Sequence, residues 1–385
     1  MGAWKSVKVS DLGKVITGKT PKTAIAENYG GTIPFLTPSD DMSVKYVKQT
    51  TKTLTERGLL EVKNALLPPD SVCVSCIGSD LGKVVITTEN TVTNQQINSI
   101  IVDKEYFDVS FIYYAMLILG KELNFISKTS TAVPIVNKSL FSSYEIKCPS
   151  LEQQKQISSI LSSFDAMIEC NQKINDNLQQ QAMALYASMF LDDPTLETTA
   201  GTLKDVADIT MGQSPSGSSY NEDGYGEVFY QGRAEFGYRF PTRRLYTTEP
   251  KRMAEAGDVL LSVRAPVGDL NVAYERCCIG RGLGAIHSRS GYQSFVLYTM
   301  FALRPQLDVF NGEGTVFGSI NRNALNDMPI NIPSDGAIAA FEAVVRPMDD
   351  MIRCNYEENC RLQELRDSLL PRLMSGEIDV SGIQL

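Results

Sequence analysis

Histidine is almost absent from this sequence: His287 is the single copy among 385 residues. This scarcity excludes catalytic triads that use a histidine base, and metal centres built from several histidines. Cys73 and Cys76 form a CxxC pair, but a zinc site of the usual kind needs a second pair or histidine partners. Cys73 lies in the run SVCVSCI, which indicates a buried strand, and we interpret His287 as a strand-end residue.

Long apolar runs are also missing, since no stretch of about 18 apolar residues occurs. We therefore expect no membrane-spanning segment. The N-terminal MGAWKSVKVS lacks the apolar core of a secretory signal, which predicts a cytoplasmic protein whose 8 cysteines are free thiols. Hydrophobic content of 43% and charged content of 21% are typical of a soluble globular protein, and 385 residues are enough for two or three domains.

An excess of positive charge is missing too, since the net charge is −9. A small DNA-binding domain is usually basic, so either nucleic acid is not the partner or the positive charge is local. The net charge is +2 over residues 1–149, −4 over 150–193, −2 over 194–333 and −5 over 334–385. The first and third segments are near neutral, which leaves room for a basic face on each.

What the sequence does contain is an internal repeat. DAMIECN at 165–171 returns as DDMIRCN at 349–355, an offset of 184 residues. Near the start of each half, Asp11, Gly18 and Pro21 match Asp205, Gly212 and Pro215 at an offset of 194. Each half has short strand-like runs with glycine and proline between them, one or two helices, and then a long helix. The repeat predicts an α+β fold with two similar α/β globules.

The residues GKVITGKT at 13–20 match the P-loop pattern for nucleotide phosphates. The second copy reads ADITMGQSP, in which Ala207 replaces Gly13 and Gln213 replaces Lys19. Both copies keep Gly-x-[Ser/Thr]-Pro, which we interpret as a strand that ends in a tight turn. A stand-alone NTPase that uses residues 13–20 remains an alternative.

Two long helices are predicted from a 4-3 spacing of apolar residues, the seam of a coiled coil. The first helix begins at Ser150, which forms a capping box with Gln153. Its seam positions are Ile157, Leu161, Phe164, Ile168, Asn171, Asn175, Leu178, Ala182, Leu185 and Met189. Adding 184 gives the second seam: Phe341, Val345, Met348, Ile352, Asn355, Asn359, Leu362, Arg366, Leu369 and Leu373.

Asn171, Asn175, Asn355 and Asn359 are expected to fix the register of the two helices, because a polar residue at a seam specifies its partner. Pro347 predicts that the second helix begins near Met348, and Gly376 predicts its end. We expect the helices to pair antiparallel as a spacer. A helix over 165–190 is about 39 Å long, close to one turn of DNA at about 34–36 Å. The alternative is that each stripe packs on its own globule.

Polar and basic residues in the globules are candidates to contact DNA. Arginine suits guanine O6 and N7, while asparagine and glutamine suit adenine. RAEFGYRFPTRR at 233–244 supplies the first chemistry, and TNQQIN at 93–98, aligned with IGRGLG at 279–284, supplies the second. The candidates are Lys19, Thr20, Lys22, Ser39, Lys45, Ser75, Asn94, Gln95, Gln96, Gln213, Ser214, Ser216, Gln231, Arg233, Arg243, Arg264 and Arg281.

Three features carry a resemblance to a known family. PSLEQQKQISSILSSFDAMIECNQKI follows the first globule, LRDSLLPRLMSGEIDV stands near the C-terminus, and Gly-x-[Ser/Thr]-Pro occurs at Gly18 and Gly212. Over essentially its whole length the chain resembles the specificity (S) subunits of type I restriction–modification enzymes. Pro347, and Asp335-Gly336-Ala337 in place of a Leu-Glu-Gln box, depart from the first copy and leave the start of the second helix open.

The resemblance implies two target recognition domains, at 1–149 and 194–333, that each read one half of a bipartite site in double-stranded DNA. It implies that the spacer helices, at 150–193 and 334–385, set the gap and bind two modification subunits. Those subunits carry S-adenosylmethionine and methylate adenine, and restriction subunits use ATP and Mg. This chain would hold no cofactor or metal and would not be an enzyme itself, which agrees with the missing Asn/Asp-Pro-Pro-aromatic motif. A scaffold that uses the coiled coil without binding DNA remains a further alternative.

Overall fold

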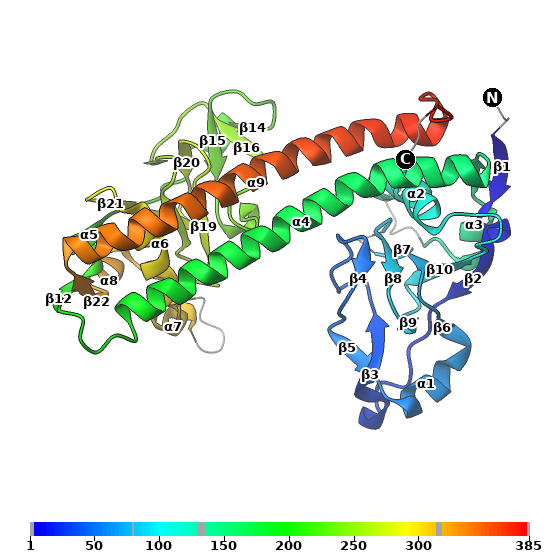
Figure 1. The fold of residues 1–385 in the computed structure, drawn as a ribbon, viewed down its shortest axis with the longest axis horizontal. Helices are drawn as coiled ribbons and strands as arrows, with labels where there is room; N and C mark the ends of the chain where they lie inside the picture. The colour runs from blue at the N-terminus through cyan, green and yellow to red at the C-terminus, as the bar shows by residue number, and fades with distance from the viewer. Residues whose placement is uncertain (1–3, 79–80, 130–134, 313–317, 383–385) are drawn as a thin grey trace. The chain divides into compact units, whose positions relative to one another are not determined.

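The structure is a computed structural model that describes residues 4–78, 81–129, 135–312 and 318–382. It forms two compact units (Figure 1). The first consists of Met1–Asn171 with Glu358–Leu385, and the second of Gln172–Glu357. Each unit includes part of both long helices, so the predicted division into four segments follows a different criterion and stays a prediction.

The first unit has two main sheets. In one sheet the strand order is β2 (Gly13–Thr17), β10 (Ile97–Val102), β7 (Ser71–Ser75), β8 (Val84–Thr87) and β4 (Tyr46–Val47). In the other it is β5 (Lys52–Leu54), β3 (Tyr29–Leu36), β9 (Thr91–Thr93) and β6 (Leu66–Leu67). A separate pair joins β1 (Lys5–Lys8) to β11 (Glu145–Cys148). The helices are α1 (Glu56–Val62), α2 (Val109–Thr129), α3 (Lys138–Ser143) and the first part of α4 (Leu151–Phe190).

The second unit repeats this plan. One sheet has the order β13 (Ala207–Met211), β21 (Leu283–Ser288), β18 (Val259–Ser262) and β19 (Leu270–Val272). The other has the order β14 (Tyr220–Asn221), β16 (Leu245–Thr247), β15 (Glu227–Tyr230), β20 (Cys277–Ile279) and β17 (Met253–Ala254). β12 (Thr198–Thr202) pairs with β22 (Pro329–Pro333). The helices are α5 (Leu203–Val206), α6 (Gln293–Ala302), α7 (Arg304–Asp308), α8 (Arg322–Asn326) and the first part of α9 (Asp335–Ser375).

The two units share strand order and strand direction. The order β2-β10-β7-β8 corresponds to β13-β21-β18-β19, and β5-β3-β9-β6 corresponds to β16-β15-β20-β17. In both second sheets the central pair is parallel, β3 with β9 and β15 with β20. The predicted internal duplication and the mixed helix and sheet class are therefore confirmed.

Apolar side chains from the first sheet of each unit pack against helices. In the first unit, Val72 and Tyr114 share a core with Leu161 of α4 and Leu373 of α9. In the second unit, Tyr186 of α4 and Phe341 of α9 pack with their ring centroids 5.6 Å apart. All five residues of β7 are buried, as predicted, and burial raises the pKa of Cys73 to about 12. His287 is the penultimate residue of β21, also as predicted.

The first long helix begins as predicted and the second does not. Ser150 precedes α4, and its Oγ accepts a hydrogen bond from the N–H of Gln153 at 3.4 Å. The predicted start of α9 near Met348 is wrong, because α9 begins at Asp335 and continues through Pro347. Proline removes one backbone hydrogen bond, and the remainder of the 41-residue helix holds this segment in place. The helix ends at Ser375, before Gly376 with φ +77°, as predicted.

Within each unit the two long helices pair antiparallel. Every predicted seam residue is described and is buried or half-buried. In the first unit, Asn171 donates to Asn359 Oδ1 at 3.0 Å, and Arg366 donates to Asp165 at 2.8 Å. In the second unit, Asn355 donates to Asn175 Oδ1 at 2.8 Å. The antiparallel pairing and the packing on the globules occur together, because the seam residues at the far ends of each helix also enter the cores.

Across the described residues, no helix combines the length and apolar character needed to cross a bilayer.

Candidate nucleic-acid interface

The duplicated glycine turn lies against a loop in each unit. Gly18 N–H donates to Ile97 O at 3.0 Å, and Gly212 N–H donates to Leu283 O at 2.9 Å. A Cβ at Gly18 would stand 2.0 Å from the carbonyl oxygen of Asn94, and one at Gly212 would stand 2.1 Å from that of Gly280. Close backbone approach therefore requires glycine in both copies. Residues 18–22, all described, form no helix, so the P-loop arrangement needed for phosphate binding is absent here.

The loop before β10 presents polar side chains in the first unit. Thr20 donates to Gln95 Oε1 at 2.5 Å, which links the turn to the loop. Asn94 is buried, and its side chain bonds both the amide and the backbone N–H of Gln96. Gln95 itself is exposed. The structure thus brings together four of the residues predicted to contact DNA.

The equivalent loop in the second unit presents arginine. Arg281 N–H donates to Ser214 Oγ at 3.3 Å, and Gln213 N–H donates to Ile279 O at 3.0 Å. A Cβ at Gly280 would stand 2.9 Å from the Cα of Gln231, so this loop also approaches the end of β15 closely. Gln213, Gln231 and Arg281 are exposed.

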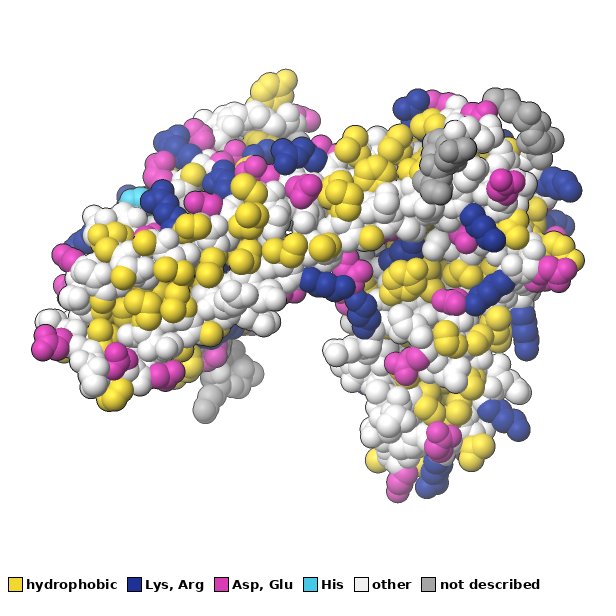
Figure 2. Space-filling model, in the orientation of Figure 1, with side chains coloured by type: hydrophobic (Ala, Val, Ile, Leu, Met, Phe, Trp, Pro, Cys, Tyr) yellow, Lys and Arg dark blue, Asp and Glu magenta, His cyan; other side chains and the backbone are white. Residues whose placement is uncertain are grey.

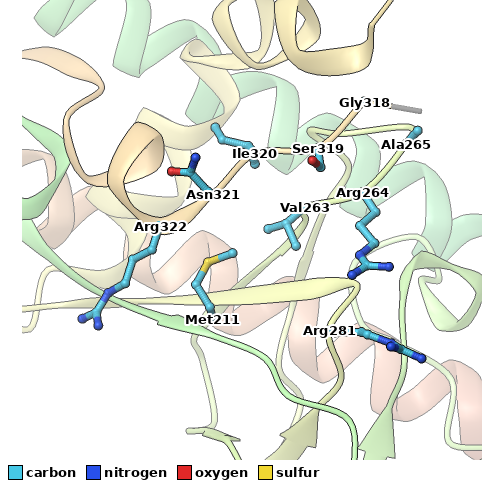
Figure 3. Close-up of a pocket in the computed structure, with 10 residues that line it drawn as sticks. All are labelled: Met211, Val263, Arg264, Ala265, Arg281, Gly318, Ser319, Ile320, Asn321 and Arg322. Carbon is cyan, nitrogen blue, oxygen red and sulfur yellow. The ribbon is translucent and has the colours of Figure 1, made fainter. Parts of the chain in front are cut away.

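Beside this loop is an open hollow of about 570 Å³. It is lined by Met211, Val263, Arg264, Ala265, Arg281, Gly318, Ser319, Ile320, Asn321 and Arg322. Figure 3 shows Arg264 and Arg281 on one side of it, Arg322 on the other, and Met211 and Val263 between them. Arg322 was missed by the sequence analysis, because only the antiparallel bridge between Arg264 and Ser319 brings its segment to this place.

The other predicted contacts lie apart from these loops or in other bonds. Lys19, Lys22, Ser39 and Ser216 are exposed, and Ser75 is buried within β7. Arg233 is paired with Asp269 at 3.0 Å, and Arg243 is paired with Glu275. These ion pairs occupy guanidinium groups that the sequence left free.

Lys45 points toward the long helix instead of outward. Its Nζ donates to Ser162 Oγ of α4 at 2.7 Å and to Tyr114 OH at 3.1 Å, and Tyr114 in turn donates to Asp165. Burial lowers the pKa of Lys45 to about 8. We therefore leave Lys45 out of the candidate interface.

The second unit has the same arrangement at its long helix. Arg239 is paired with Asp349 of α9, and Tyr298 donates to Asp349 at 3.0 Å. Arg239 follows Lys45 by 194 residues, while Tyr298 and Asp349 follow Tyr114 and Asp165 by 184. We name these two groups the unit clamps: Lys45, Tyr114 and Asp165 in the first unit, and Arg239, Tyr298 and Asp349 in the second. The repeat offsets carried the signal, and the sequence analysis did not use it there.

Comparisons with known proteins place these features in context. The family model described as "Type I restriction modification DNA specificity domain" matches residues 1–180. The putative type I restriction enzyme MjaX specificity subunit of Methanocaldococcus jannaschii is 31% identical over 292 residues, which cover 70% of this chain and 68% of that protein. The MjaIX specificity subunit of the same organism is 24% identical and covers 99% of this chain and 94% of that protein.

Solved structures also include a similar fold. The type I restriction–modification system S subunit from M. genitalium matches with a TM-score of 0.55 at 16% identity, over 97% of this chain and 96% of that one. At this identity the similarity concerns the fold alone.

Proposed function

Because this chain belongs to the family of type I restriction–modification specificity subunits, we propose that it reads a bipartite site in double-stranded DNA, one half-site with each unit. Members of this family are specificity subunits and not the catalytic ones. One observation carries the proposal: two units of equal strand order present different side chains at the same place, Gln95 in one and Arg281 in the other. A shared scaffold with unlike polar residues is what two readers of unlike sequences require.

In this proposal the chain docks two modification subunits and also joins restriction subunits in the cytoplasm. S-adenosylmethionine, ATP and Mg²⁺ belong to those partners, and this chain holds none of them. The gap between half-sites is set by the 40-residue α4 and the 41-residue α9. Two equal partners need two equivalent docking surfaces on this chain.

The long helices offer a duplicated surface of this kind. Outside the seam, apolar residues recur every seven positions in stretches that we name the docking stripes. They are Ile160, Met167 and Ile174 on α4, and Val344, Met351 and Leu365 on α9. Met167 and Met351 are related by the repeat and are 47% and 51% exposed. Figure 2 shows hydrophobic side chains on the surface along both long helices. Exposed apolar patches of this kind support partner binding.

Methylation mapping tests the proposal directly. The full chain is co-expressed with its modification subunit in a host that lacks adenine methylation, and the methylated adenines of the genome are mapped. We expect methylation at sites with two specified parts and an unspecified gap. A continuous recognition sequence would contradict the proposal, as would an absence of site-specific methylation by an assembled complex.

Native mass spectrometry tests the docking surfaces. Met351→Glu is expected to reduce the number of bound modification subunits from two to one, and Met167→Glu to do the same, because a charge replaces the centre of a stripe. Met183 is 41% exposed but lies outside both stripes, so Met183→Glu serves as the control. Unchanged binding in both stripe variants, or loss of binding in the control, would contradict this assignment.

A further inference from the structure

Most arginines of the second unit are held in ion pairs. Seven of the eleven between residues 194 and 333 contact a carboxylate: Arg233, Arg239, Arg243, Arg244, Arg276, Arg289 and Arg304. Among the described residues, the guanidinium groups of Arg252, Arg264, Arg281 and Arg322 have no such partner. Charged side chains are free in the folded unit at these four positions only.

Three of these four arginines line the single hollow described above. Arg264, Arg281 and Arg322 reach it from three different parts of the chain, and no carboxylate is among its described lining residues (Figure 3). The hollow therefore offers donors for hydrogen bonds without acceptors to satisfy them. Its floor of Met211 and Val263 is apolar, which suits the flat face or edge of a base better than a hydrated ion.

The equivalent place in the first unit has a different chemistry. Ile77 pairs with Ile135 there, in the same kind of antiparallel bridge that joins Arg264 to Ser319. Gln95 stands where the second unit has Arg281, and Lys138 stands where it has Arg322. Thr17 Oγ1 donates to Asn98 Oδ1 at 2.6 Å, so a neutral hydrogen-bond network occupies this position. One place on the shared fold therefore carries three arginines in one unit and one lysine in the other.

The loop that carries Arg281 is held by its backbone while its side chain is free. Ser214 Oγ accepts the Arg281 N–H at 3.3 Å, Gly280 N–H donates to Tyr230 O at 2.8 Å, and Val263 N–H donates to Gly282 O at 3.0 Å. A fixed backbone with an exposed forked donor is the arrangement that reading a base edge requires.

Resting on the proposed function, we propose that this hollow is the base-reading site of the second unit and that Arg281 recognises a guanine of its half-site. The two donors of Arg281 bond O6 and N7 of the base in the major groove. Arg264 and Arg322 supply positive charge beside it for the flanking phosphates. Gln95 holds the corresponding position in the first unit.

The test uses the full chain in complex with its modification subunit, with methylation of a randomised half-site library as the readout. Arg281→Gln is expected to lose about 10- to 100-fold of the preference for guanine at one position of the second half-site. Arg281→Lys keeps the charge without the fork and is expected to relax the same position. The first half-site should be read unchanged by both variants, which also verifies that the assembly has folded.

Arg252 supplies the matched control, because it is exposed and unpaired but does not line the hollow. Arg252→Gln should leave both half-sites unchanged. If Arg281→Gln lowers methylation of all library members equally, or leaves the guanine preference intact, the inference is overturned while the proposed function stands. If the wild-type complex methylates no two-part site, the proposed function itself has failed.

Discussion

At the scale of single residues, the two unit clamps are built from equivalent positions but pair their carboxylates differently. Asp165 receives both the Tyr114 hydroxyl and, at 2.8 Å, the Arg366 guanidinium. The position equivalent to Arg366 in the second unit is Ala182. Arg239 is therefore the sole cation in an ion pair with Asp349 among the described residues, and desolvation raises the pKa of that carboxyl.

This difference predicts unequal costs of substitution. Arg239→Met leaves a buried carboxylate without a cation and is expected to destabilise the second unit by about 3–5 kcal/mol. Lys45→Met leaves Asp165 paired with Arg366 and is expected to cost less than about 1 kcal/mol. Hydrogen exchange of α6 amides reports the second unit and that of α2 reports the first. Equal losses in the two variants would contradict the asymmetry.

Lys45 also gives the first unit a dependence on pH. Its pKa in the folded protein is about 8, below its ordinary value of 10.5, because burial disfavours the charged form. Between these values the unfolded chain binds more protons than the folded chain, so stability rises as pH increases from about 8 to about 10.5. The gain is about 3 kcal/mol, and Lys45→Met should abolish it. Denaturant unfolding of both proteins at pH 7.5 and 9.5, followed in α2, measures the difference.

Single residues also show where the sequence sufficed. The glycines at 18 and 212 were predicted to end strands, because a tight turn needs them, and their closeness to the next loop explains why no other residue fits. The free or paired state of arginine could not be predicted. Arg233 and Arg243 find carboxylates 36 and 32 residues away, and only the folded sheet brings these groups together.

At the scale of elements, the seam residues predicted both helices, and one proline misplaced the start of the second. Pro347 is exposed and lies inside α9, where its cost is offset by the packing of Phe341 and Val345 on the core. The equivalent position in α4 is Ser163. A local breaker therefore gave the wrong helix start, since tertiary packing overrides propensity.

Pro347→Ser tests this account. The substitution restores a backbone N–H in mid-helix and is expected to stabilise the second unit by about 1–3 kcal/mol. Thermal unfolding and hydrogen exchange of the first part of α9 are the measurements. Ser163→Pro in α4 is the mirror-image control and should destabilise by a similar amount. A loss of stability in Pro347→Ser would show that the helix requires the distortion that proline brings.

At the scale of the whole molecule, the chain is a pair of similar units crossed by two continuous helices. The offsets of 194 and 184 residues predicted this duplication, because an inserted loop shifts the offset without changing the strand order. The unit boundaries were less accessible to prediction. They fall inside α4 and α9, where composition does not change.

Those boundaries define a test of the proposed spacer. Inserting one seam heptad after Asn171 and another after Glu357 lengthens both helices by about 10 Å and leaves the contacts within each unit intact. In the proposed mechanism the gap between half-sites grows by about three base pairs, or methylation is lost because the half-sites no longer face the complex together. Methylation mapping distinguishes these results from an unchanged gap, which would refute the role of the helices.

The asparagine pairs have a consequence for ancestry. Asn359 is the repeat counterpart of Asn175, and Asn355 is that of Asn171, so each pair joins one residue to the copy of its neighbour. A polypeptide with a single repeat would carry both halves of this bond on one helix and would be complementary to itself. Gene fusion of such a homodimer yields the present chain, and it frees each recognition head to diverge without disturbing the joint.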